Sequence, residues 1–157
     1  MHPSSVITPS PLGSPETVQI PTTLLEAMRF YRDPDVAART LAAARWGDAT
    51  ECLHCHSREQ HWYISTRRIW KCRACRKQFS PKAGTIFEDS PIHLDRWLIA
   101  IWMVANSEHR VSSYKLNRVV GVTQTTAQFM LRRIRLAVQS AQSKGEAIPA
   151  FEATDSQ

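Results

Sequence analysis

All four cysteines of this 157-residue chain lie between positions 52 and 75, as two C-x2-C pairs separated by sixteen residues. A two-residue gap lets a tight turn point both sulfurs at one ion, and the long gap brings a second turn back opposite the first. The pattern predicts one structural, tetrahedral Zn²⁺ ion with no open position for a catalytic water. The expected ligands are Cys52, Cys55, Cys72 and Cys75.

The residue types in this stretch leave other possibilities open. The cysteines could form two disulfides, which a reducing compartment disfavours, or bind iron, which four thiolates also accept. His54 and His56 lie close enough along the chain to be rival ligands, but with four thiolates available they are expected to be exposed residues of the cysteine turn. His61 is expected to be a bystander. Zinc is preferred because all four cysteines are used and none is left over.

Helical signals flank the cysteine region on both sides. Residues 23–32 open with a capping-box pattern, and residues 34–46 begin with Asp-Pro and end at a glycine, so two helices are expected there. Within the cysteine region, residues 62–64 and 69–70 read as strands on either side of a turn.

The period of apolar residues becomes helical beyond Pro91. Residues 94–105 predict a scaffold helix with one apolar stripe, made up of Leu94, Trp97, Leu98, Ile101, Trp102 and Ala105. Two more helices are expected at 112–120 and from 123 to about 141, separated by Gly121-Val122.

These elements predict an α+β fold, mainly α, with a small four-cysteine zinc ribbon inserted between N-terminal helices and a helix-turn-helix bundle. The division expected is a disordered tail at 1–21, N-terminal helices at 22–50, the zinc ribbon at 51–90, the helix-turn-helix bundle at 91–141 and a flexible tail at 142–157. The first tail is inferred from five prolines interspersed with serines.

No segment suggests export or membrane insertion. The first 21 residues lack the apolar core of a signal peptide, and the longest apolar run, at 97–105, has nine residues where roughly 20 are needed to span a bilayer. A soluble, cytoplasmic protein without a membrane partner is therefore expected.

The balance of charge favours polyanionic partners. Lys and Arg number 20 against 14 Asp and Glu, for a net charge of +6. Between positions 67 and 82 there is no acid and there are seven basic residues: Arg67, Arg68, Lys71, Arg73, Arg76, Lys77 and Lys82. They either contact phosphate or merely offset the anionic thiolates, and the sequence favours neither use.

Residues 111–138 have the layout of a helix-turn-helix, with a short helix, a glycine turn and a longer helix that starts after Thr123. The start of the longer helix would meet base edges in duplex DNA, and two later arginines would contact phosphate. The candidates for base edges are Gln124, Thr125, Gln128 and Arg132, and those for phosphate are Arg133 and Arg135.

The inner face of the longer helix is expected at Ala127, Leu131, Ile134 and Val138. Phe129 and Leu136 sit nearly opposite this face, which indicates that something else packs against them. An ordinary helical hairpin with a basic, solvated face is the alternative to DNA binding.

Four segments together resemble a known family. They are "ARWGDATECLHCHS", "RRIWKCRACRKQFSPKAGTIFEDS", "RWLIAIWMVANS" and "VGVTQTTAQFMLRRIRLAV". In this order they resemble the N-terminal half of ISXO-type insertion-sequence transposases, over about residues 30–139. The resemblance implies zinc ligation by the four cysteines and binding of transposon-end DNA.

Members of that family continue into a catalytic domain with Asp-Asp-Glu carboxylates, and this sequence has no counterpart of it. Glu152 and Asp155 only faintly resemble its opening. We therefore expect a non-enzymatic, truncated or split transposase product that binds double-stranded DNA. The alternatives are a zinc-ribbon module that docks on itself or on a full-length transposase and regulates it, and a gene remnant without function.

Overall fold

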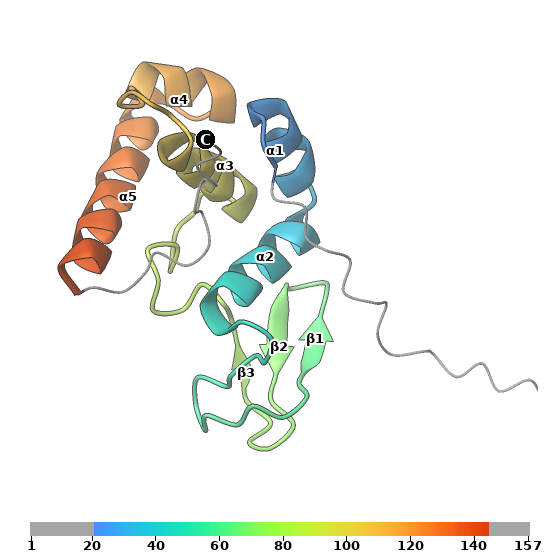
Figure 1. Cartoon of the computed structure of the whole chain (residues 1–157). Helices are drawn as coiled ribbons and strands as arrows, with labels where there is room; N and C mark the ends of the chain where they lie inside the picture. Colours follow the sequence, from blue (N-terminus) through green and yellow to red (C-terminus); the bar gives the residue numbers. More distant parts are fainter. Residues whose placement is uncertain (1–20, 145–157) are drawn as a thin grey trace, which may run out of the picture.

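The computed structural model describes residues 21–144, which form five helices and three short strands (Figure 1). The predicted α+β, mainly helical fold class is confirmed. In chain order the elements are α1 (Leu24–Tyr31), α2 (Pro34–Trp46), β1 (Trp62–Ile64), β2 (Ile69–Lys71), β3 (Gln78–Phe79), α3 (Leu94–Ala105), α4 (Ser113–Val120) and α5 (Gln124–Lys144).

Both predicted tails lie almost wholly outside the described residues. Of the tail predicted at 1–21, only Pro21 is described, and its carbonyl accepts a hydrogen bond from Trp102 Nε1 at 2.9 Å. Of the tail predicted at 142–157, residues 142–144 are helical, so that α5 is longer than expected. No helix within residues 21–144 has the length and apolarity needed to cross a membrane.

Helix starts and ends follow the local signals in the sequence. The capping box of α1 is present in full, with the amide of Glu26 donating to the Thr23 side chain and the Glu26 carboxylate accepting from the Thr23 amide. The Asp33 side chain caps α2 by accepting one hydrogen bond, from the amide of Asp35. Gly121 ends α4 in the left-handed conformation, with φ of 69°, which a residue without a Cβ adopts at no steric cost.

The larger buried cluster surrounds α3 (Figure 1). Six residues of α3 are buried, because α1 and α2 contact it from one side and α4 and α5 from the other. The prediction of one apolar stripe was too narrow: Ile99, Ala100 and Met103 are buried as well, whereas Ala105 is exposed. A helix packed on several sides buries most of its circumference.

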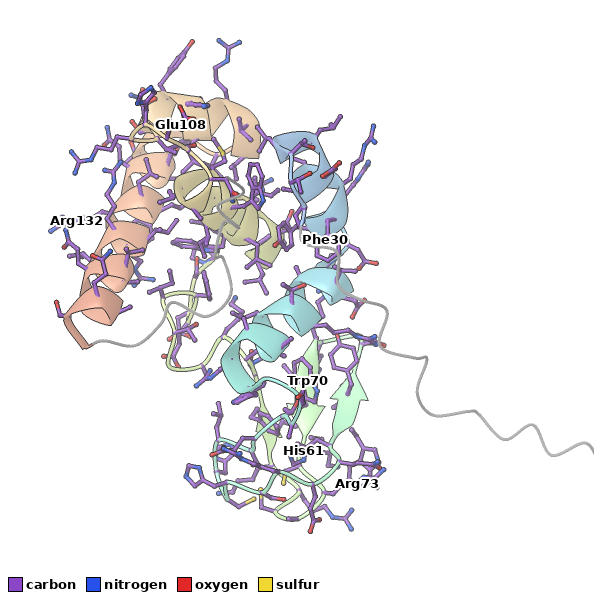
Figure 2. All side chains as sticks on the ribbon, viewed as in Figure 1. Phe30, His61, Trp70, Arg73, Glu108 and Arg132 are labelled. Atoms are coloured by element: carbon purple, nitrogen blue, oxygen red, sulfur yellow. The ribbon has the colours of Figure 1, made fainter. Side chains whose placement is uncertain are left out.

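The smaller buried cluster lies between the ribbon and α2. The three strands pair antiparallel in the order β1-β2-β3, and one cross-strand row consists of Tyr63, Trp70 and Phe79. This row faces α2, where Trp46 packs edge-to-face on Trp70 at 6.0 Å and on Phe79 at 5.7 Å between ring centroids. Figure 2 shows Trp70 between α2 and the sheet.

Helix α2 is shared by both clusters. Its Ala37 and Leu41 belong to the helical cluster around α3, and its Ala42 belongs to the ribbon cluster. The guanidinium of Arg45 also donates hydrogen bonds to the carbonyls of Pro81 and Ala83, just beyond β3. These contacts fix the ribbon to the helices.

Candidate metal centre and basic groove

The two C-x2-C turns have the same backbone geometry. In the first, the amide of Cys52 donates to the carbonyl of Ser57, and the amide of His56 donates back to the carbonyl of Cys52, both at 3.0 Å. The second repeats this pattern from Cys72, with Arg76 in the place of His56. His56 and Arg76 both have positive φ, 58° and 63°, so the two turns present their sulfurs in the same way.

The four sulfurs fit a tetrahedral zinc ion. All lie within 4.8 Å of one another, and two pairs, Cys52 with Cys75 and Cys55 with Cys72, are 3.7 and 3.6 Å apart. Zn–S bonds of about 2.3 Å place tetrahedral sulfurs about 3.8 Å apart, whereas a disulfide requires about 2.05 Å. The prediction that the four cysteines can hold one structural zinc ion is confirmed.

The neighbouring histidines turn away from the sulfurs. His56 Nδ1 contacts a carboxylate oxygen of Glu51 at 2.9 Å, and His54 Nε2 lies 3.2 Å from the carbonyl of Gln78. His61 packs edge-on against Phe79, with Nε2 3.1 Å from the carbonyl of Ser57. None of the three histidines belongs to the cluster of potential metal ligands.

The thiols differ in their tendency to ionise. Burial raises the pKa of Cys72, but hydrogen bonds from the amides of Cys75 and Ala74 and from neighbouring thiols outweigh burial and lower that pKa to about 6. The amide of Ser57 lowers the pKa of Cys55, but burial and the other three thiols outweigh it and raise that pKa to about 11. A divalent ion must therefore displace protons as it binds.

Zinc affinity should consequently fall as the pH is lowered, because protons compete for the same sulfurs. The fall should steepen below about pH 6, where Cys72 itself takes up a proton. Competition against a chromophoric chelator over a pH series measures this dependence. An affinity that does not change with pH would contradict thiolate ligation.

The ribbon has relatives among known proteins. Residues 32–78 match the family described as the transposase zinc-ribbon domain. The ribbon is related to that of transposases. The match begins at Arg32, just before α2, in agreement with the packing of α2 against the sheet.

A relative in Halobacterium salinarum, an uncharacterized protein in transposable element ISH50, is 32% identical over 68 residues. The aligned stretch covers 42% of this chain and 23% of the relative, so the chain spans about a quarter of that protein's length. No solved structure matches the chain.

The basic residues of the transposase-related ribbon lie at two ends of its hairpin. Arg67 and Arg68 are exposed in the turn between β1 and β2, whereas Arg73, Arg76 and Lys77 are exposed beside the second cysteine turn. Because β2 runs from one end of the hairpin to the other, the predicted set does not form one continuous patch. Whether either group contacts DNA stays a prediction.

Helix α5 presents the predicted base-reading residues to solvent. Gln124, Thr125, Gln128 and Arg132 are all exposed, and Figure 2 shows Arg132 pointing outward from α5. The predicted inner face is confirmed at Ala127, Leu131 and Ile134, which are buried, with Val138 partly buried against the same cluster. Met130 is also buried, which the sequence reasoning missed.

The two arginines predicted to contact phosphate are bound to backbone carbonyls. Arg133 donates to Ile86 at 2.8 Å and stacks on Phe129 at 4.9 Å from its ring centroid, while Arg135 donates to Val111 at 2.9 Å. A guanidinium has five N–H donors, so each of these two arginines has further donors that could bind a phosphate. Their part in DNA binding stays a prediction.

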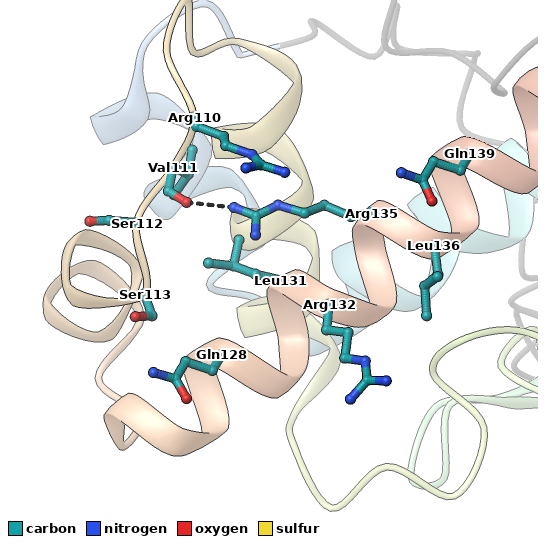
Figure 3. A pocket seen from close by; sticks show the side chains of 10 residues that line it. All are labelled: Arg110, Val111, Ser112, Ser113, Gln128, Leu131, Arg132, Arg135, Leu136 and Gln139. Carbon is teal, nitrogen blue, oxygen red and sulfur yellow. Dashed lines mark hydrogen bonds between the residues drawn. The ribbon is translucent and has the colours of Figure 1, made fainter.

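An open groove lies between α5 and the segment that leads into α4 (Figure 3). Three arginines line it, Arg110, Arg132 and Arg135, together with Gln128 and with no acidic residue. The serines lining it are Ser112, which caps α4, and Ser113. The sequence analysis did not include Arg110 among the candidate residues. Its position two residues before the helix cap Ser112 could have indicated that it lies near the start of α4.

Proposed function

We propose that this chain binds double-stranded DNA in a transposition system, with α4 and α5 acting as a helix-turn-helix. The observation that carries the proposal is the groove of Figure 3, in which three arginines lie beside the exposed amide side chains of α5. Arginine and glutamine are side chains that read base edges in the major groove, and arginine also binds phosphate.

The spacing along α5 supports this use. Positions 124, 128, 132, 135 and 139 follow one another at intervals of four, four, three and four residues, so they lie on one face of the helix. All five are Gln or Arg. A helix that carries a continuous row of donors on one exposed face suits insertion into a groove about 12 Å wide.

Replacing Arg132 with alanine tests the proposal. If Arg132 reads a base, affinity for the preferred duplex should fall by about 1–3 kcal/mol, with a smaller loss on random duplex. The preferred duplex would be found by selection from a random library, and the affinities measured by fluorescence anisotropy over a salt series. An equal loss on both duplexes, with a shallower salt slope, would show phosphate contact instead.

Arg29→Ala is the matched control, because Arg29 is exposed on α1 and its removal changes the net charge by the same amount. We expect it to leave the preference between duplexes unchanged. A wild-type protein without measurable duplex affinity at low salt would overturn the proposed function. Salt-insensitive self-association would then favour the second candidate, a ribbon module that docks on another copy or on a full-length transposase.

The proposal includes binding without strand cleavage by this chain. Cleavage with two metal ions needs carboxylates that converge from distant segments. Glu152 and Asp155, the residues considered for that role, lie outside the described part of the chain. Nicking of DNA by the purified protein with Mg²⁺ or Mn²⁺ would contradict this part of the proposal.

A further inference from the structure

The sheet of the ribbon has a second face that none of the helices within residues 21–144 covers. The cross-strand row on that face consists of Trp62, Lys71 and Gln78, which alternate along the strands with the row that packs on α2. Trp62 and Gln78 are exposed and Lys71 is half-buried, whereas Trp70 and Phe79 on the other face are buried. One face of the sheet thus forms the core and the other is free.

Trp62 is the more exposed of the two tryptophans in the ribbon. Its side chain is 40% exposed and belongs to neither buried cluster, unlike the tryptophans at 46, 70, 97 and 102. It also lies on β1, an edge strand. A single exposed aromatic side chain is ordinary on a protein surface, so only the groups around Trp62 can indicate a ligand site.

Two arginines lie over the Trp62 ring. The guanidinium carbons of Arg73 and Arg76 are 5.3 and 5.4 Å from the ring centroid, close enough for cation–π attraction. Arg76 takes the left-handed position of its cysteine turn, so the turn that holds the metal also directs this side chain. No acidic residue occurs from position 60 to position 87. The free face therefore combines a partly exposed indole with two arginines that lie over it.

We propose that this face binds single-stranded nucleic acid, with an unpaired base stacked on Trp62 and the adjacent phosphates held by Arg73 and Arg76. The indole offers a face on which any base can stack, and guanidinium groups beside it suit a phosphate backbone. Lys71, directly across from Trp62 in the pairing of β1 with β2, adds a third cation on the same face.

Single strands suit this face better than duplex DNA does. Bases inside a duplex are stacked on one another, so an aromatic ring on a sheet cannot reach their faces without unstacking them. The site is also separate from the groove beside α5: Figure 2 shows Arg73 at the far end of the ribbon and Arg132 on the outer side of α5. The inference adds a second form of nucleic acid to the proposed function and depends on different residues.

The test compares two variants at one position, Trp62→Phe and Trp62→Leu, in the zinc-loaded full chain. Both keep an apolar side chain, but only phenylalanine keeps an aromatic face. With a labelled oligothymidylate of about 12 nucleotides, we expect the leucine variant to lose roughly 5- to 100-fold in affinity and the phenylalanine variant to lose much less. Affinity for duplex DNA should be unchanged in both.

Tryptophan fluorescence gives an independent readout. The chain has five tryptophans, of which Trp62 is exposed and Trp70, Trp97 and Trp102 are buried, so a stacked base should quench mainly the emission of Trp62. The quenching should disappear in Trp62→Leu. A double Arg73→Ala/Arg76→Ala variant, which touches exposed side chains only, should weaken oligothymidylate binding and flatten its salt dependence.

The outcomes separate this inference from the proposed function. No binding of oligothymidylate, equal affinities of the leucine and phenylalanine variants, or an equal loss on duplex and single strand would overturn the stacking site. Arg132→Ala should leave oligothymidylate binding unchanged, and its effect on duplex binding tests the proposed function alone. Loss of zinc from Trp62→Leu would be seen by metal analysis and would show a structural role, against the inference.

Discussion

Replacing Cys72 with serine is expected to abolish zinc binding and to unfold the ribbon while most of the helical structure persists. Cys72 is fully buried and lies in the ribbon cluster with Cys52, Trp70 and Phe79. So few buried residues cannot hold strands of two or three residues together, and metal binding must supply the folding free energy. In zinc-finger peptides this contribution is about 10–16 kcal/mol.

The helical cluster contains no residue of the cysteine turns or of β1–β3, so its packing does not require the metal. Far-UV circular dichroism of Cys72→Ser should therefore retain most of its helical signal. The emission of Trp46 and Trp70, which pack on each other, should shift toward that of solvated indole. Zinc content, measured by elemental analysis, should fall from one ion per chain to none.

His54→Ala is the matched control for this experiment. The His54 side chain contacts the carbonyl of Gln78, and only its backbone amide, which alanine keeps, donates to the sulfur of Cys52. The variant should therefore keep its zinc and its melting temperature. An unchanged melting curve for Cys72→Ser would contradict structural zinc. Collapse of the entire helical signal would show instead that α2 transmits the loss of the ribbon to the larger cluster.

The sequence predicted what depends on neighbours in the chain. Thr23, Asp33 and Ser112 begin helices because their side chains accept hydrogen bonds from amides two or three residues later, and those contacts are visible in the sequence as spacing. The metal site was predictable for the same reason. Each C-x2-C turn is local, and chelation by four thiolates leaves little choice in how the two turns meet.

Features that depend on contacts between distant segments were not predictable in the same way. The alanines of α2 give no distinct apolar stripe, and their use becomes clear only when Ala37 faces α3 and Ala42 faces the sheet. Arg135 reads as a surface cation in the sequence, yet its guanidinium binds the carbonyl of Val111. Small or long side chains fit several environments, and tertiary packing selects one of them.

The candidate surfaces for nucleic acid likewise combine residues placed by local spacing with residues brought in by distant contacts. Helical spacing placed Gln128 and Arg132 on the exposed face of α5, but Arg110 joins them only because the chain before α4 passes beside α5. On the ribbon, the sequence predicted the strand at 62–64 that carries Trp62. Its two stacked arginines come from residues beyond β2, which only the folded cysteine turn brings back to the ring.

Replacing Trp97 with alanine is expected to destabilise the helical cluster by about 3–5 kcal/mol, a large part of the 5–15 kcal/mol of a typical domain. Trp97 is fully buried at the start of α3, where its ring contacts Phe87 at 5.5 Å and Phe129 at 6.5 Å between centroids. Its Nε1 donates to Ser90 at 3.0 Å, so the variant also leaves a hydroxyl without this partner. Chemical denaturation monitored by circular dichroism measures the loss.

Phe129 links this prediction to α5, because it is 45% exposed and makes an edge-to-face contact with Trp97. Removal of the indole should loosen the middle of α5. The affinity for duplex DNA should then fall, although Trp97 does not line the groove beside α5. Trp62→Ala is the control: the same substitution at an exposed tryptophan should cost less than about 1 kcal/mol. Equal destabilisation by the two variants would contradict the assignment of Trp97 to the core that holds α5 in place.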